Sequence, residues 1–69
     1  MWQQYEIGVI NNTDIYSEPD TTSEIIYAIK ENSEVLVDML ESTDMFFKII
    51  TAFGAEGFCL RNFVSLKFS

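Results

Sequence analysis

The 69-residue sequence predicts an all-β fold, a small β-barrel of five to six short antiparallel strands. Residues 5–10 and 35–40 each alternate with the period of two that is expected for half-buried strands. Polar segments with turn-forming residues separate the apolar runs, and no segment keeps helical spacing for long. Strands at such even spacing in a short chain favour a barrel, because closure removes the exposed edges of an open sheet.

Further apolar runs and the turns between them complete the expected order of elements. Residues 46–51 and 64–68 are two more candidate strands, since they are rich in aromatic and β-branched side chains. Turns are expected at residues 11–14, 18–20, 31–33, 41–44 and 53–55. The longest polar loop runs from residue 17 to residue 24. Because no repeat or linker interrupts this order, we treat residues 1–69 as one domain.

The composition indicates a core that forms without a covalent link or a metal. Hydrophobic residues make up 48% of the chain and include six Phe, three Tyr and one Trp, too many for a disordered tail. The chain has one cysteine, Cys59, and no His, which excludes an intrachain disulfide and a four-ligand zinc site. Without an activating His or a CxxC partner, Cys59 is expected to pack in the core. We expect no cofactor and no enzymatic activity.

The charge of the chain is acidic and unevenly distributed. The formal net charge is −7, and residues 1–44 carry −9 whereas residues 45–69 carry +2. Since Lys and Arg supply most of the affinity for phosphate backbones, direct binding of nucleic acid is not expected, and a basic protein partner fits better. Four acids surround one loop, but their spacing matches no calcium-binding loop, so we expect a solvated acidic surface and no metal. These acids are Asp14, Glu18, Asp20 and Glu24.

The sequence contains no segment that points to a membrane. Its first residues lack the basic start and the apolar run of a secretory signal, and no apolar stretch approaches the length of a membrane span. A cytoplasmic protein without membrane association is therefore expected. A domain excised from a longer secreted protein would instead be extracellular or associated with the cell wall.

Four segments between about residues 8 and 64 stand in the order and spacing of a known family. They are IYSEPDTTS at 15–23, IIYAIKENSEVLV at 25–37, FFKI at 46–49 and GFCLRNFV at 57–64. With these segments the chain resembles the bacterial SH3 domains, which fold as small SH3-like β-barrels. The resemblance implies a binding or targeting module without catalytic activity, and it implies no particular ligand.

Five positions depart from the pattern of SH3 domains: Glu18 and Asn32 stand where the family usually has Gly, and three further departures concern the groove. Phe46 stands where the bacterial family usually has Trp, and Leu60 and Phe63 stand where eukaryotic SH3 domains have Pro and Tyr. Eukaryotic SH3 domains use these side chains to hold proline-rich helices. A proline-rich ligand is therefore not expected here.

Aromatic residues near the expected groove form the candidate binding surface. Alternation places Phe46 and Phe47 on opposite faces of one strand, so either one ring points outward or into a groove, or a strongly curved barrel buries both. By resemblance, the groove lies between the long loop and the loop that precedes this strand, and its acidic rim favours a partner with Lys or Arg. The candidate residues are the aromatics Tyr16, Phe46, Phe58 and Phe63 and the rim acids Glu18, Asp20, Glu41 and Asp44.

The leading functional hypothesis is a non-catalytic SH3-like module that recognises a protein or peptide through this groove. Two alternatives stay open. One is a domain that targets peptidoglycan peptides of the cell wall, cut from a larger secreted hydrolase. The other is a small acidic inhibitor from a phage or mobile element that blocks a basic nucleic-acid-binding protein. The chain is expected to be a monomer or a weak homodimer, joined by edge strands or by the region of Trp2 and Tyr5, which could also cap the barrel.

Overall fold

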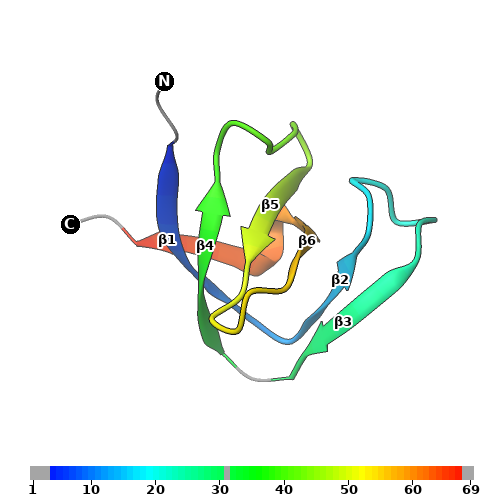
Figure 1. Cartoon of the computed structure of the whole chain (residues 1–69), viewed down its shortest axis with the longest axis horizontal. Coiled ribbons are helices and arrows are strands. Elements are labelled where there is room, and N and C mark those ends of the chain that lie inside the picture. Colours follow the sequence, from blue (N-terminus) through cyan, green and yellow to red (C-terminus); the bar gives the residue numbers. More distant parts are fainter. Residues whose placement is uncertain (1–3, 31, 68–69) are drawn as a thin grey trace.

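A computed structural model describes residues 4–30 and 32–67, and its strands form one antiparallel sheet (Figure 1). The elements are β1 (Tyr5–Ile10), β2 (Thr13–Tyr16), β3 (Ile25–Ile29), β4 (Ser33–Asp38), β5 (Phe46–Ile50), β6 (Glu56–Leu60), the 3₁₀ helix η1 (Arg61–Phe63) and β7 (Val64–Lys67). In this part of the chain no helix is long and apolar enough to cross a membrane. Trp2, Glu31 and Phe68, which entered the expectations above, lie outside the described residues.

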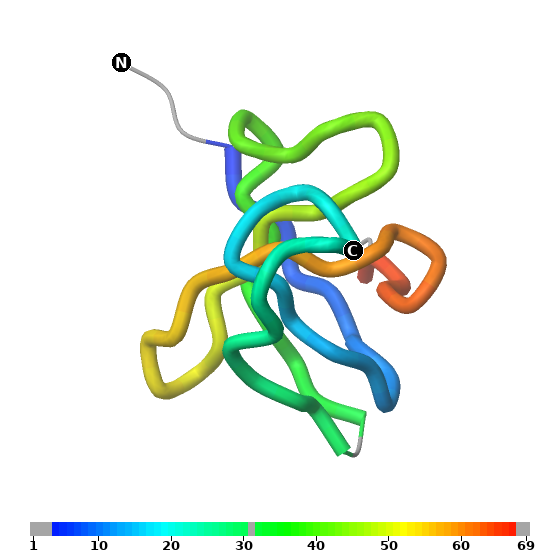
Figure 2. The backbone as a smooth tube through the Cα atoms, turned by 90° about the vertical axis from the view of Figure 1, so that its right-hand side faces the viewer, coloured from blue at the N-terminus to red at the C-terminus, as the bar shows by residue number. Residues whose placement is uncertain are grey.

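The sheet confirms the all-β fold class but has more strands than expected. Its order is β3-β2-β6-β5-β4-β1-β7, which gives seven strands instead of five to six. The count was too low because β2 has only four residues, too few to show the alternation that reveals a strand. The order ends at β3 and β7, and the described strands curl strongly without closing into a continuous barrel (Figures 1 and 2).

The core lies on the inner side of this curved sheet. Val37, Ile49 and Cys59 are fully buried there on three neighbouring strands. Val37 is the cross-strand partner of Ile49, and Phe47 is the partner of Cys59, so β4, β5 and β6 contribute from the same face. The other members of the cluster are Ile10, Ile15, Ile29, Val35 and Val64. The expectation that Cys59 packs in the core is confirmed.

Strand β1 turns much of its apolar surface outward. Gly8 and Ile10 are buried, whereas Ile7 is exposed beside β4. A Cβ atom on Gly8 would lie 2.8 Å from Cγ1 of Val64 and 3.2 Å from Cγ2 of Val37. Only glycine lets β1 approach the core this closely between β4 and β7, and this approach fixes which face of β1 points inward.

The turn between β5 and β6 is held by Thr51 and Gly54. The backbone N–H of Thr51 donates to the Ala55 carbonyl over 2.8 Å, and the Gly54 N–H donates back to the Thr51 carbonyl over 3.0 Å. The buried hydroxyl of Thr51 accepts a further hydrogen bond of 3.0 Å from the Ala55 N–H. Gly54 has a φ of 91°, a conformation that favours glycine. The turn expected at residues 53–55 is therefore confirmed.

Two neighbouring residues of β4 provide a matched test of the inner and outer faces. Val37→Asp would place an unpaired charge in the core, at a cost of several kcal/mol against a total stability of about 3 to 5 kcal/mol for a domain of this size. Thermal and urea unfolding followed by circular dichroism should show no folded state for this variant. The exposed Leu36 is the control, and Leu36→Asp should cost under about 1 kcal/mol. Equal effects of the two substitutions would contradict this assignment of the faces.

Candidate functional site

The candidate site lies on the outer side of the sheet, between two loops. The loop of residues 17–24 joins β2 to β3, and the loop of residues 39–45 joins β4 to β5. Both loops lie at the upper end of the molecule in two perpendicular views (Figures 1 and 2). Between them, Lys48 of β5 pairs with Phe58 of β6, and Phe58 pairs with Tyr16 of β2. Cross-strand partners share one face, so these three side chains form a row.

Phe46 lies two residues before Lys48 on β5 and therefore shares its face. Its ring meets the ring of Tyr16 edge to face, with centroids 6.2 Å apart and an angle of 87° between the ring planes. Phe46 is only 6% exposed, yet it does not belong to the core cluster, which contains Phe47 instead. The curved sheet thus buries the rings of both Phe46 and Phe47, on opposite sides of β5. Of the two expected outcomes, burial of both rings is the one observed. We call Tyr16, Phe46 and Phe58 the aromatic patch.

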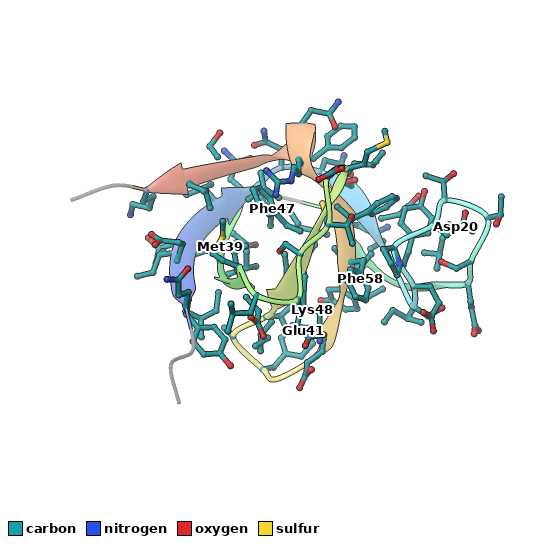
Figure 3. The ribbon with its side chains drawn as sticks, turned by 90° about the horizontal axis from the view of Figure 1, so that it is seen from above. Asp20, Met39, Glu41, Phe47, Lys48 and Phe58 are labelled. Carbon is teal, nitrogen blue, oxygen red and sulfur yellow. The ribbon has the colours of Figure 1, made fainter. Side chains whose placement is uncertain are left out.

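Lys48 forms a cation–π contact with one ring of the aromatic patch. The Nζ atom of Lys48 lies 5.5 Å from the centroid of the Phe58 ring and 3.4 Å from Oε1 of Glu56. Figure 3 shows Lys48 beside Phe58. The cation is attracted by the electron-rich face of the ring and is neutralised by the carboxylate. Lys48 was not among the candidate residues, although its alternation with Phe46 on one strand placed it on the same face.

The structure places Phe63 apart from the aromatic patch. Phe63 lies in η1 and packs, partly buried, against the core cluster. Its carbonyl accepts a 3.0 Å hydrogen bond from the Asn11 N–H, which ties η1 to the end of β1. Among the described residues it makes no ring contact with the other three candidate aromatics. Three of the four candidates are therefore together, and the fourth supports the core.

Hydrogen bonds within the loop of residues 17–24 determine which of its acids are available. The Asp20 carboxylate accepts bonds from the Thr22 N–H at 2.9 Å and the Thr22 hydroxyl at 2.8 Å. These bonds hold the pKa of Asp20 below its usual value, the backbone bond having the larger effect. The Glu18 carboxylate has no such partner in the described chain and is exposed. Asp20 thus shapes the loop, while Glu18 presents a free charge.

The loop of residues 39–45 is also held by its own side chains. The Asp38 carboxylate accepts a 3.1 Å hydrogen bond from the Leu40 N–H. The Ser42 hydroxyl donates to the Asp38 carbonyl over 2.8 Å and accepts from the Lys48 N–H over 2.9 Å. Asp44, an exposed acid without a partner in the described chain, lies at the end of this loop. The loop is therefore a preformed wall of the site.

Arg61, the first residue of η1, bonds to the loop of residues 39–45. Its guanidinium lies 4.5 Å from the centroid of the Phe47 ring, and its Nε–H donates to the Thr43 carbonyl over 3.0 Å. Its backbone N–H donates to the Met45 carbonyl, also over 3.0 Å. Met45, next to Phe46 in sequence, is left 65% exposed. The fixed loop thus presents an apolar side chain to solvent at the start of β5.

Hollows lined by described residues also lie away from the aromatic patch. One, of about 310 Å³, is on the outer face of β1, β4 and β5 and is lined in part by Ile7, Leu36 and Ile50. Another, of about 560 Å³, runs along β3 and the turn that follows it. In residues 4–30 and 32–67, no three Cys, Asp or Glu side chains are grouped so that they could hold a metal ion.

Comparisons with family models, with curated proteins and with solved structures find no match for the chain. The functional interpretation of the aromatic patch therefore rests on its own geometry and charge, together with the four segments that resemble bacterial SH3 domains.

The buried thiol provides a test of the core beneath the site. Burial raises the pKa of Cys59 to about 11, and a hydrogen bond with Thr13 offsets this rise only in part. We expect a thiol reagent at pH 8 to label the folded protein about 100-fold or more slowly than the unfolded chain, because reaction requires opening of the core.

The exposed position Ser65 supplies the control for this labelling. A Ser65→Cys variant should gain one thiol that reacts as fast as that of an unfolded chain. Labelling of Cys59 at that same rate in the folded parent protein would contradict its burial.

Proposed function

We propose that the chain is a non-catalytic binding module that holds a protein or peptide partner across the aromatic patch. The observation that carries this proposal is the grouping of three aromatic rings on the outer face of the sheet, beside two fixed loops. Tyr16 and Phe58 are partly exposed there, and Phe46 is buried against Tyr16. Aromatic side chains dominate the binding energy of many protein interfaces, because they bury a large area with few rotatable bonds.

The charges around the patch favour a partner with Lys or Arg. Glu18 stands on one bordering loop and Asp44 on the other, and neither carboxylate has a partner among the described residues. The cation at the site, Lys48, is already neutralised by Glu56. The open electrostatic positions are therefore negative, which would steer a basic segment toward the patch and fix its orientation.

The resemblance to bacterial SH3 domains supports the same class of function. In the matched order of segments, the candidate groove lies between the loops that here border the aromatic patch. The departures at Phe46, Leu60 and Phe63 argue against a proline-rich ligand, so we propose an apolar and basic segment. A peptidoglycan peptide and a basic nucleic-acid-binding protein are the two candidate sources of such a segment. Retention on purified peptidoglycan distinguishes the first from the second.

The test selects ligands without assuming their identity. A random peptide library displayed on phage is selected on the immobilised protein, and a selected peptide is synthesised for titration calorimetry. We expect the selected peptides to combine Lys or Arg with apolar residues. Phe58→Ala should weaken binding about tenfold or more, because it removes one aromatic contact of the patch. Phe46 is not suitable for this purpose, since truncation of a ring buried this deeply would cost about 3 to 5 kcal/mol and unfold the protein.

Two controls decide the location of the binding surface. Phe53→Ala removes an exposed ring from the turn between β5 and β6, and it should leave affinity unchanged. Glu18→Lys combined with Asp44→Lys should weaken binding about tenfold at low salt, whereas the distant Glu34→Lys should have little effect. Binding that Phe58→Ala leaves intact, or a library that yields no ligand, would contradict the proposal. Retention on purified peptidoglycan that Phe58→Ala abolishes would identify a cell-wall peptide as the ligand.

A further inference from the structure

Strand β3 is an open edge of the sheet that carries neither charge nor proline. It pairs with β2 on one side and stands at the end of the strand order (Figure 1). Its five residues, IIYAI, include no charge and no proline. The opposite edge, β7, has four residues and carries Lys67, which forms an ion pair of 2.6 Å with Glu34. Natural proteins usually protect a sheet edge with charged residues, proline or a β-bulge. Strand β3 has no charge and no proline, and its one irregularity is a register shift against β2 between Ile15 and Tyr16, opposite Ile26.

The side chains of β3 are unusually exposed for such an apolar segment. Ile25 is 51% exposed, Ile26 44% and Tyr27 38%. Tyr27 rests against Phe53, with the ring centroids 5.1 Å apart, which holds the middle of the strand in place. The 560 Å³ hollow runs along the second half of this strand. It is lined by Tyr27, Ala28, Ile29, Lys30, Asn32 and Ser33.

The residues that flank β3 carry opposite charges at equal distances from its centre. Glu24 precedes the strand by one residue and Lys30 follows it by one, so Tyr27 lies midway between them. Both flanking residues are exposed, and neither side chain forms an ion pair within the described part of the chain. Lys30 is also the single basic residue among the first 44 of the sequence.

We propose that this edge pairs with the β3 strand of a second copy of the chain, antiparallel and centred on Tyr27. In that register Glu24 of each copy lies opposite Lys30 of the other, and Ile25 lies opposite Ile29. The start of the partner strand then enters the hollow beside Lys30. Parallel pairing would instead set Glu24 against Glu24 and Lys30 against Lys30. The sequence is thus complementary to itself in one orientation only.

The expected dimer is weak. A single five-residue strand pair lies at the low end of interface size. Each copy also carries a net charge of −7, so the two copies repel each other at long range. The two Glu24–Lys30 pairs are local attractions that oppose this repulsion. The pairing uses the backbone edge of β3, whereas the aromatic patch uses side chains on the face of the sheet, although Tyr16 of the patch is the cross-strand partner of Ile25. The inference does not depend on the proposed function.

Charge exchange at the two flanking positions tests the pairing and its register. Sedimentation equilibrium of the parent protein, from micromolar to millimolar concentration, should show a transition from the 8.0 kDa monomer to twice that mass. Glu24→Lys and Lys30→Glu each place like charges opposite one another, and each should weaken self-association about tenfold. Glu24→Lys lowers the net negative charge while Lys30→Glu raises it, so a common weakening cannot arise from overall repulsion.

Mixing the two variants supplies the decisive measurement. An equimolar mixture of Glu24→Lys and Lys30→Glu proteins restores opposite charges at both pairs, and it should dimerise at least as well as the parent protein. Glu41→Lys, a change of equal charge on the distant loop of residues 39–45, should not weaken the dimer. A parent protein that stays monomeric at millimolar concentration would overturn the proposal. So would a dimer that neither single variant weakens, or a mixture that is not rescued.

Discussion

The packing of Val37, Ile49 and Cys59 on adjacent strands is the interaction on which the rest of the structure depends. These residues come from β4, β5 and β6 and are fully buried, and no disulfide can share their role because the chain has one cysteine. Because Ile49 and Cys59 point inward and successive side chains of a strand point to opposite faces, Phe46, Lys48 and Phe58 must point to the outer face. The aromatic patch is therefore a direct consequence of the core, on the reverse side of the same strands.

Part of this arrangement could be predicted from sequence, and the reason differs from strand to strand. In β4, Val35 and Val37 alternate with Glu34 and Asp38, so polarity alone identifies the inner face. In β1 the more apolar set, Tyr5, Ile7 and Val9, lies on the outer face. The inner face, which includes Glu6, is determined by the close approach of Gly8 to neighbouring strands, a tertiary property. The position of Phe63 against the core likewise depends on where η1 packs. Local pattern predicts an element, whereas pairing of distant strands determines its exposed face.

The acidic residues of the two bordering loops also differ in a way that the sequence pattern could not predict. Sequence placed Glu18, Asp20 and Asp44 around one groove without distinguishing among them. In the structure, the Asp20 carboxylate accepts hydrogen bonds from the Thr22 N–H and hydroxyl. The carboxylates of Glu18 and Asp44 have no partner among the described residues. Since Asx turns of this kind satisfy a carboxylate locally, a cluster of acids in a loop overstates the number of carboxylates that are open to direct contact with a ligand. Asp20 still adds its negative charge to the field at the aromatic patch, because its lowered pKa keeps the carboxylate ionised.

An open edge and an aromatic patch on one small sheet have a joint consequence. Two copies joined through β3 would present two patches, related by the two-fold axis at Tyr27, on one continuous sheet. A partner with one basic segment would gain no affinity from this arrangement. A partner with repeated segments, spaced so that both patches are engaged together, would bind more tightly without any new contact, since its second binding event is intramolecular. Weak self-association would thus give a 69-residue domain a preference for repetitive or dimeric partners that its single patch cannot supply.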